Sequence, residues 1–341
     1  MSTTEVLDPV STTTQVASDA PAVQTRRFPQ TVGNASNRWG VILAGGDDVH
    51  LRELTRVAPG HDRPKQFCTL LGSHTLLEET RKRAERSIPP KQILFPVTRA
   101  HERYYLRYLA SRAAQRIVQP CNKGTAPAIL CALMRVARMD PEAIVAIFPC
   151  DHVYSPESAF TIALESAFTL VEQRSRAVVL LGAQPKSPGV DHGWIEVGEP
   201  VHRQAGLYRV KGFHENPPLA VAQDLFRAGS LWNTFVMVGR ARSFLGMAQD
   251  AVPALLQVFE SESARRGPDG EIRIADSVYD RIAPTDFSRQ ILSAATDRLL
   301  ALRLSGIEWS DLDDPHQVLA TLAGGQRNLP GWAMRWSTSA A

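Results

Sequence analysis

Two adjacent glycines and one lysine have the types and the spacing that phosphate binding requires. Gly45-Gly46 follows the apolar run 41–44, and Lys65 comes about twenty residues later. Glycine has no Cβ, so its backbone N–H group can approach an anion closely, and a lysine held nearby can offset phosphate charge. No Gly-Lys-Ser/Thr follows the glycines, so the pattern is not a Walker loop. A tight turn with an exposed lysine is the alternative that these residues alone leave open.

Two aspartates stand at the ends of apolar runs that we predict to be strands. Asp151 follows the run 143–148, and Asp311 follows Trp309 after a late run. Mg²⁺ prefers one or two carboxylates together with phosphate and water oxygens, so each acid can hold the ion against a nucleotide. A turn or a helix cap is the alternative for either aspartate taken alone.

The start of one expected helix offers a further anion site. Thr125 can cap a helix that begins at Ala126, and Pro127 suits the first turn because its missing N–H would be unpaired there in any case. The free N–H groups of such a start attract phosphate. An ordinary capped helix explains the same residues equally well.

The elements that must position these residues alternate in the first half of the chain. Short apolar runs predict strands, and apolar residues at helical spacing predict helices. We expect strands at 41–44, 93–97, 143–148 and 177–182, and helices at 74–86, 101–112, 126–139 and 156–174. This alternation is typical of βαβ units, which form parallel sheets with helices on both faces and bind ligands beyond the carboxyl ends of the strands.

The second half has a different pattern. Strands are expected at 194–197, 207–213, 232–238 and 300–304, and helices at 219–228, 241–260 and 274–282. We therefore predict an α/β fold: a Rossmann-like nucleotide-binding mixed sheet, mainly parallel, flanked by helices and carrying a smaller antiparallel extension. The expected division is a disordered N-terminal leader at 1–38, one compact domain at 39–325 and a C-terminal tail at 326–341, because the leader has too little large apolar surface to fold.

Composition excludes several classes of protein. The 341 residues are 44% apolar and 21% charged, the balance of a soluble protein with a real core. A net charge of +3 and 7% aromatic residues argue against nucleic acid as a partner. The apolar runs fall far short of the ~20 residues of a membrane helix, so no membrane association is expected. The four cysteines show no Cys-x-x-Cys pair, which predicts reduced side chains in a cytoplasmic protein.

Seven blocks, in order over about residues 39–322, resemble the sugar-1-phosphate nucleotidyltransferases, and specifically the mannose-1-phosphate guanylyltransferases. The blocks are Leu43-Ala44-Gly45-Gly46 with Pro64-Lys65-Gln66-Phe67, Gly124-Thr125-Ala126-Pro127-Ala128-Ile129, Phe148-Pro149-Cys150-Asp151-His152, Gly193-Trp194-Ile195-Glu196, Phe213-His214-Glu215-Asn216-Pro217, Leu231-Trp232-Asn233-Thr234-Phe235 and Trp309-Ser310-Asp311-Leu312. Their order makes the resemblance far more specific than any single block would be.

The resemblance implies nucleotidyl transfer from GTP to a sugar-1-phosphate, with mannose-1-phosphate favoured and pyrophosphate released. It implies catalytic roles for Lys65 and His50, and Mg²⁺ as the cofactor on Asp151 and Asp311. Sugar contacts are implied for Gly193, Glu196 and Asn233. Nucleotide contacts are implied for Leu43, Ala44, Gly45, Gly46, Gln66, Thr125 and Ala126. Three histidines, His152, His192 and His214, have no partner that the sequence identifies, and a homo-oligomer is left open.

Three positions depart from the family pattern. Asp48 and His50 stand where the family usually has Gly and Arg, and Asn216 replaces the Lys of the Glu-Lys-Pro block. The changes remove positive charge from a site that must hold polyanions, since histidine is mostly neutral at pH 7. Impaired transfer is one expectation, and a catalytically degenerate paralogue that binds nucleotide or regulates a partner is the alternative. A dinucleotide-dependent dehydrogenase is disfavoured because the third glycine of Gly-x-Gly-x-x-Gly is missing.

Overall fold

The computed structural model of the chain describes residues 37–47, 51, 55, 63–201, 205–261, 265–324 and 333. These residues all lie in the compact unit that spans 34–341. The predicted leader and tail lie almost wholly outside the described residues, so the predicted division into domains stays a prediction. Within the described ranges, no helix combines the length and the apolar character needed to cross a membrane.

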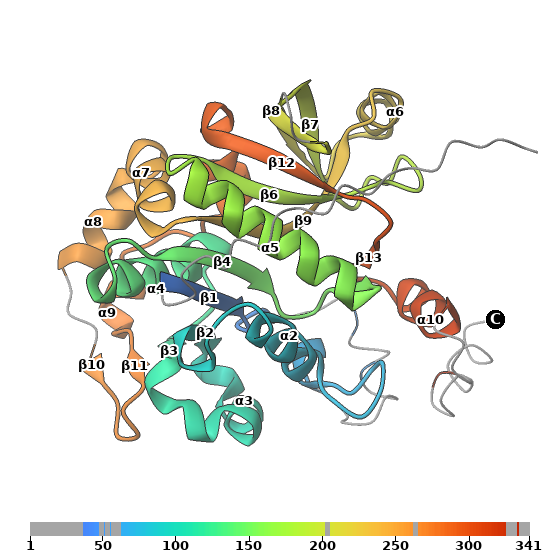
Figure 1. Cartoon of the computed structure of the whole chain (residues 1–341). Helices are drawn as coiled ribbons and strands as arrows, with labels where there is room; N and C mark the ends of the chain where they lie inside the picture. The colour runs from blue at the N-terminus through green and yellow to red at the C-terminus, as the bar shows by residue number, and fades with distance from the viewer. Residues whose placement is uncertain are drawn as a thin grey trace, which may run out of the picture. The chain divides into compact units, whose positions relative to one another are not determined.

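One eleven-stranded sheet runs through the described chain (Figure 1). Its strands, in spatial order, are β10 (Arg265–Arg266), β11 (Ile272–Arg273), β3 (Arg116–Gln119), β2 (Ile93–Thr98), β1 (Arg38–Leu43), β4 (Ile144–Pro149), β9 (Leu231–Arg240), β6 (Val178–Ala183), β12 (Leu299–Leu304), β8 (Leu207–Glu215) and β7 (Gly193–Pro200). A separate antiparallel pair joins β5 (Val153–Ser155) to β13 (Glu308–Ser310).

The sheet is mixed rather than mainly parallel. From β11 through β3, β2 and β1 to β4 the strands are parallel, as the alternating first half of the sequence predicts. Beyond β4, however, β9 runs antiparallel to both of its neighbours, β4 and β6, and β8 runs antiparallel to β7 and β12. The apolar pattern of a strand indicates which face is buried but not its direction, so the sequence could not show that β9 inserts between β4 and β6.

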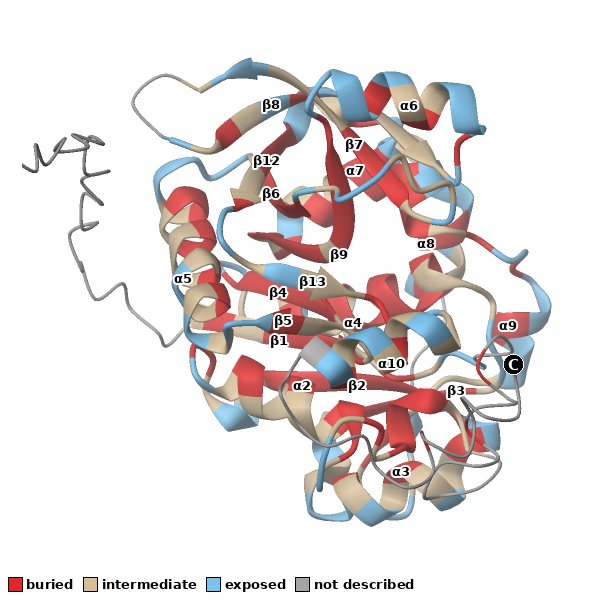
Figure 2. Ribbon diagram, turned by 90° about the vertical axis from the view of Figure 1, so that its right-hand side faces the viewer, coloured by how far each residue is buried: buried red, intermediate tan, exposed pale blue. Residues whose placement is uncertain are grey.

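Helices cover both faces of the sheet (Figures 1 and 2). On one face lie α2 (Leu76–Glu85), α3 (Glu102–Leu109) and α5 (Glu157–Gln173), and on the other lie α4 (Thr125–Met139), α7 (Ala241–Ala251), α8 (Pro253–Ser261) and α9 (Asp276–Asp280). Successive strand residues point to opposite faces, and so Val41 packs in one apolar layer and Ile42 in the other. The remaining helices are α6 (Leu219–Arg227), α10 (Pro315–Gly324) and the short η2 (Lys65–Phe67), η3 (Pro90–Gln92), η4 (Arg99–His101), η5 (Ala110–Gln115), η6 (Ser288–Leu292) and η7 (Thr296–Arg298).

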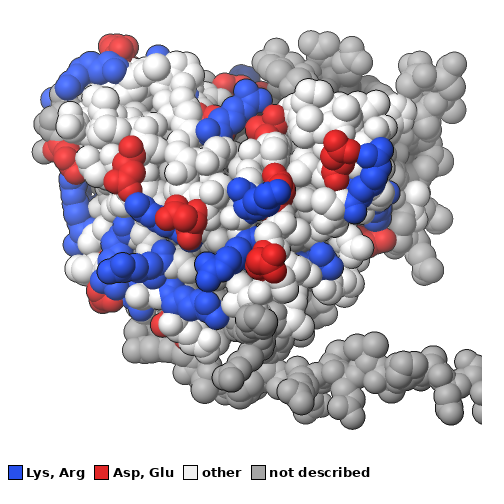
Figure 3. All heavy atoms as spheres, turned by 90° about the horizontal axis from the view of Figure 1, so that it is seen from above, with Lys and Arg blue, Asp and Glu red and all other residues white. Residues whose placement is uncertain are grey.

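The helix predicted at 241–260 is two helices. Its first part, α7, ends before Val252, which takes a non-helical backbone, and α8 begins at Pro253. A proline disfavours helical geometry in the residue before it, which explains the break. The face seen in Figure 3 carries Lys and Arg side chains interleaved with Asp and Glu rather than separated from them.

Candidate active site

Two aspartates and a lysine meet beyond the carboxyl ends of β1 and β4. Asp151 lies between β4 and β5, and Asp311 directly follows β13. Because β13 pairs with β5 in the register Ser310↔Val153, the two acids are brought to one place although they are far apart in sequence. Lys65 begins η2, the short helix that follows the glycine-containing segment. The structure thus brings together the three residues that the sequence analysis singled out for chemistry.

The Lys65 ammonium lies at the centre of this group. The residue is only 3% exposed. Its Nζ is 3.3 Å from Asp151 Oδ2, pairs with Asp313 Oδ1, and donates to the carbonyl oxygens of Asp311 and Leu312 at 3.3 and 3.5 Å. A buried cation needs such oxygen partners to replace water. Asp313 was not predicted, although it stands two residues after a predicted site residue.

Asp311 presents one carboxylate oxygen with a partner and one without. Its Oδ2 lies 3.0 Å from Nδ1 of His192, whereas its buried Oδ1 has no hydrogen-bond partner among the described residues. Burial alone would raise the pKa of this carboxyl, but the His192 imidazole and the nearby cations hold the pKa below its usual range. A buried carboxylate oxygen without a partner is costly and therefore marks a position suited to a ligand or a cation.

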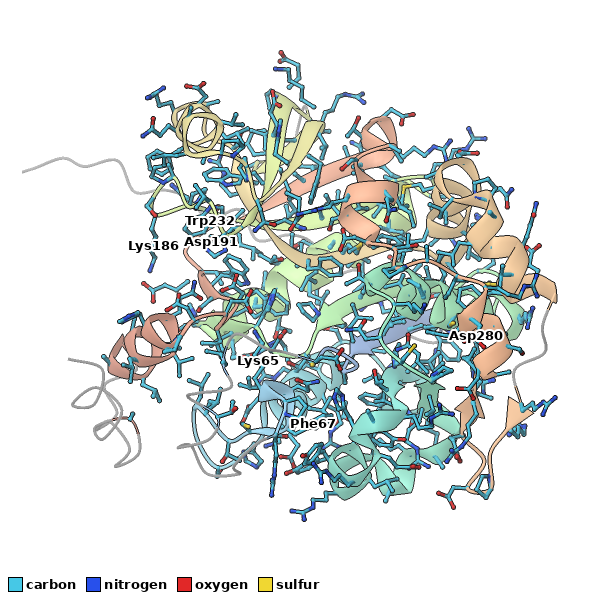
Figure 4. The ribbon with its side chains drawn as sticks, turned by 180° about the vertical axis from the view of Figure 1, so that it is seen from behind. Lys65, Phe67, Lys186, Asp191, Trp232 and Asp280 are labelled. Atoms are coloured by element: carbon cyan, nitrogen blue, oxygen red, sulfur yellow. The ribbon has the colours of Figure 1, made fainter. Side chains whose placement is uncertain are left out.

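Aromatic rings surround the His192 side chain. Its ring centroid lies 4.4 Å from that of Trp232 and 5.4 Å from that of Trp309, both with edge-to-face geometry. Trp309 Nε1 also donates to Nδ1 of His152 at 3.2 Å, and burial lowers the pKa of His152. In Figure 4 the labels of Trp232, Asp191 and Lys65 lie in the left half of the view, with Trp232 near Asp191, while Asp280 lies on the right.

The three histidines therefore have partners that the sequence did not identify. His192 contacts Asp311, His152 contacts Trp309 and Asp151, and His214 contacts Glu196. Asp311 and Trp309 are far in sequence from His192 and His152, so no local spacing could reveal these two contacts. Pairing of β7 with β8 brings His214 next to Glu196.

The glycine-containing segment is packed tightly at Gly45 and openly at Gly46. Thr98 Oγ1 donates to the Gly45 carbonyl at 2.7 Å, and Gln66 Nε2 donates to the Gly46 carbonyl at 2.8 Å. A Cβ at Gly45 would lie 2.9 Å from Thr98 Oγ1, which explains the glycine there, whereas a Cβ at Gly46 would meet nothing within 4 Å. Hydrogen bonds from Gln66 and Thr98 thus fix the backbone of the two glycines. The predicted nucleotide residues Leu43 and Ala44 precede it, with Ala44 fully buried.

Two of the residues that depart from the family pattern, Asp48 and His50, lie outside the described residues. The third, Asn216, is exposed and follows β8 with a left-handed backbone, φ 48°. Phe235 and Leu312 are the other non-glycine residues with positive φ in the described part of the chain, at 57° and 52°. Such backbone is uncommon outside glycine and is found often at functional sites. Phe235 and Leu312 lie inside the blocks that carry the predicted site residues Asn233 and Asp311, whereas the block of Asn216 carries none.

The start of α4 differs from the prediction. The helix begins at Thr125 rather than Ala126, so Thr125 is its first helical residue and not its cap. Its hydroxyl instead accepts from the backbone N–H of Phe287 at 2.8 Å and donates to Asp286 at 3.1 Å. The N–H of Ala126 donates to the carbonyl of Thr285 at 3.0 Å, so this group is not free for a nucleotide. A loop from far along the chain supplies these partners, which local sequence cannot show.

The residues predicted to contact a sugar lie on the antiparallel strands. Glu196 on β7 pairs with Lys211 Nζ at 2.6 Å and with His214 Nε2 at 2.9 Å, and its pKa is lowered by those two partners. Asn233 on β9 is 8% exposed, and its side-chain oxygen accepts from the N–H of Phe235 at 3.0 Å. Glu196 and Asn233 therefore hold defined orientations through separate sets of contacts.

Glu215 on β8 was not singled out from the sequence. It lies opposite Gly193 in the pairing of β8 with β7, and its Oε2 is buried with no hydrogen-bond partner among the described residues. Burial, helped by the charge of Asp286, raises the pKa of Glu215 to about 7 despite the opposing effects of Arg289 and His192. A neutral carboxyl can both donate and accept, a property that suits recognition of hydroxyl groups. Its place in the 213–217 block was the signal.

Comparison with known proteins identifies a family and several relatives. The model of the nucleotidyl transferase family matches residues 39–318. The xanthan biosynthesis protein XanB of Xanthomonas campestris is 29% identical over 245 residues, which are 69% of this chain and 48% of that protein. The alginate biosynthesis protein AlgA of Pseudomonas aeruginosa is 28% identical, with 80% and 56% covered, and a mannose-1-phosphate guanylyltransferase of Escherichia coli is 27% identical, with 81% and 58% covered. The chain spans about half the length of these curated relatives.

Solved structures share the fold. A protein from Thermus thermophilus named mannose-1-phosphate geranyltransferase aligns with a TM-score of 0.68 at 24% identity, covering 81% of this chain and 76% of that one. A mannose-6-phosphate isomerase from Helicobacter pylori aligns with a TM-score of 0.64 at 20% identity, covering 80% and 99%. At these identities the likeness concerns the fold, a mixed α/β sheet with helices on both faces.

Proposed function

The chain belongs to the nucleotidyl transferase family, and from this premise we propose that it transfers a nucleotidyl group from GTP to mannose-1-phosphate. The convergence of Lys65 and Asp151 with Asp311 at one end of the sheet is the observation that carries the proposal. The choice of guanine and of mannose rests on the resemblance of the sequence blocks, and the relative named mannose-1-phosphate guanylyltransferase supports it.

In the proposed reaction a phosphate oxygen of the sugar-1-phosphate attacks the α-phosphorus of GTP. A new P–O bond forms, the bond between the α-phosphorus and the oxygen leading to the β-phosphorus breaks, and pyrophosphate leaves with that electron pair. No general base is needed, because the attacking phosphate is already ionised. The protein must align the two polyanions and offset their repulsion, which is the main requirement of phosphoryl and nucleotidyl transfer.

We assign separate parts of this task to different described residues. Gly45 and Gly46, fastened by Thr98 and Gln66, form a segment whose backbone can approach phosphate. Lys65 supplies an ammonium group beside it, and we assign this group to the charge that develops on the leaving pyrophosphate. On the antiparallel strands Glu196, Asn233 and Glu215, whose pKa is raised to about 7, offer acceptors and donors to sugar hydroxyls.

The donor set fits a magnesium ion. Carboxylate oxygens are the ligands that Mg²⁺ prefers, and the buried Oδ1 of Asp311 lacks any other partner among the described residues. We propose that Asp151 and Asp311 hold Mg²⁺ together with phosphate oxygens of the substrate. When bound, the ion would neutralise phosphate charge and help to orient the triphosphate. Asp151 also lies 3.3 Å from the Lys65 ammonium, so this lysine and the ion draw on the same carboxylate.

The comparisons lend no support to the alternative of a catalytically degenerate paralogue, nor to impaired activity. Asp48 and His50 lie outside the described residues, so the argument from their charges has no structural counterpart. Lys211, which contacts Glu196, and Arg289, which acts on Glu215, supply positive charge near the strands that carry the sugar residues. The cytoplasmic location and a homo-oligomer remain predictions.

A direct assay tests the proposal. The full chain is given GTP, mannose-1-phosphate and Mg²⁺, and the release of pyrophosphate and the formation of GDP-mannose are followed. We expect release only when all three are present, and less release with other nucleoside triphosphates or with glucose-1-phosphate. No release above background with any pair of nucleotide and sugar-1-phosphate would overturn the proposed transfer. Activity with a different pair would correct only the substrate assignment.

A further inference from the structure

His192 has the contacts of a residue that orients Asp311. Its Nδ1 lies 3.0 Å from Asp311 Oδ2, close enough for a polar contact although the pair does not reach full hydrogen-bond alignment. Both side chains are nearly enclosed, at 12% and 9% exposure, so water competes little for the contact. Low local dielectric strengthens such a contact.

The ring of His192 has little freedom to turn away. It packs edge-to-face against the indoles of Trp232 and Trp309, with ring centroids 4.4 and 5.4 Å away. Trp194, two residues further along, has its Nε1 donating to the Gly189 carbonyl at 2.9 Å, which fastens the segment that precedes β7. The imidazole is therefore held by packing from two other strands and by its own segment.

The Asp311 carboxylate is correspondingly fixed from several sides. Its carbonyl accepts from Lys65 Nζ, the next residue, Leu312, has a left-handed backbone, and Oδ2 faces His192. What remains is Oδ1, which is buried and without a partner among the described residues. The geometry leaves one oxygen of the carboxylate engaged and directs the other toward whatever the site binds.

We propose that His192 is a positioning residue, which holds Oδ2 of Asp311 so that Oδ1 is available to a divalent cation. This inference rests on the proposed function, because it takes Asp311 as a ligand of that cation. Partners of metal ligands fix the orientation of those ligands, and their removal typically weakens metal binding by about 10- to 100-fold. A histidine that served only to pack against Trp232 and Trp309 would not affect the strength of metal binding.

The test measures Mn²⁺ binding to the full chain in the absence of substrates, from the electron paramagnetic resonance signal of the free ion. His192→Phe keeps a planar ring packed against the two indoles but has no ring N–H. We expect this variant to bind Mn²⁺ at least about tenfold more weakly. His192→Asn places an amide N–H near the position of Nδ1 and should bind Mn²⁺ more nearly as the unaltered chain does. His74→Phe, at an exposed histidine, is the matched control and should leave binding unchanged.

Each outcome decides the proposal. Equal Mn²⁺ binding by the unaltered chain and by His192→Phe would overturn it, as would equal loss in His192→Asn and His192→Phe. If the phenylalanine variant does not fold, as judged by its thermal midpoint, His192→Ala makes the same comparison. No Mn²⁺ binding by the unaltered chain would remove both the metal site and this role of His192. Pyrophosphate release in the earlier assay would still judge the transfer reaction separately.

Discussion

Ser310 lies opposite Val153 in the antiparallel pairing of β13 with β5, and this register contact sets the geometry of the candidate active site. Asp311 comes one residue after Ser310, and Asp151 comes two residues before Val153. A slip of the pairing by one residue would turn the side chains of β13 to the opposite face. The two acids therefore depend on a two-stranded sheet of three residues each, and Lys65 bridges them at its end.

Replacing Lys65 should remove most of the activity. In Lys65→Met the flexible apolar side chain fills similar space, but the developing charge on pyrophosphate loses its cation, and we expect kcat to fall on the order of 10²- to 10³-fold. Pyrophosphate release at saturating substrates measures this. Lys186→Met is the matched control, because that lysine is exposed and contacts only Glu308 among the partners described, at 3.4 Å. Similar kcat values for the two variants would refute the role of Lys65.

The two adjacent glycines should respond differently to alanine. At Gly45 the new methyl group would lie 2.9 Å from Thr98 Oγ1, and we expect a loss of stability of about 1–3 kcal/mol, as for overpacking. At Gly46 the methyl meets no atom within 4 Å, so stability should change by less than about 0.5 kcal/mol while the KM for GTP rises. Urea unfolding and steady-state kinetics separate the two effects. An unchanged KM in Gly46→Ala would contradict phosphate binding there.

Gly124 directly precedes α4 and packs closely against the backbone of Thr285. Its φ of +91° and ψ of −177° lie in a region that is essentially restricted to glycine and cost an L-residue about 1–3 kcal/mol. A Cβ would also lie 2.4 Å from the Thr285 carbonyl oxygen. Gly270 has the same φ with nothing within 4 Å, so Gly270→Ala carries only the backbone effect. We expect Gly124→Ala to be the more destabilising in urea unfolding. Equal losses of stability in the two variants would mean that the backbone at Thr285 moves away from the new methyl group at little cost.

Glu215 should make stability depend on pH in one direction. Its pKa is raised to about 7 in the folded chain, so the folded state binds more protons than the unfolded state between pH 4.5 and 7. Stability from this group is therefore complete below pH 4.5 and falls as the pH rises through 7. Glu215→Gln stays neutral and should gain relative to the unaltered chain over that interval, by no more than about 3 kcal/mol.

Urea unfolding of both chains at several pH values measures the difference. A difference that stays constant from pH 4.5 to 7 would show that Glu215 titrates normally. The charges of Asp286, Arg289 and His192 all act on Glu215, so the comparison uses the difference between the two chains rather than either curve alone.

Sequence predicted the site better than it predicted the contacts that hold the site. Asp151 and Asp311 could be found because each stands near the end of an apolar run, and strand ends meet at one edge of a sheet. Lys65 could be found because it follows the paired glycines. The cap assigned to Thr125 was wrong because the Thr285–Phe287 loop engages its hydroxyl. No partner could be assigned to His192, and Asp313 and Glu215 were not singled out, because their contacts join residues that lie apart in the sequence and no local pattern records them.

The same distinction applies to the fold. Buried strands were placed to within a few residues, since apolar runs report burial, as in β4 and β6. The antiparallel direction of β9 depends on which neighbours it pairs with, and that choice involves residues far away in the chain.

Strand β9 connects two parts of the candidate active site. Its first residues pair with β7 and β6 and carry Asn233, and its later residues pair with β4, the strand that leads to Asp151. One continuous strand therefore links the segment that carries Asn233 to the strand that leads to Asp151. The pairing of β9 with β6 is irregular between Asn233 and Met237, where Phe235 has a left-handed backbone. Under the proposed function, a change in the length or stiffness of this irregular segment would alter the distance between the sugar phosphate and the nucleotide.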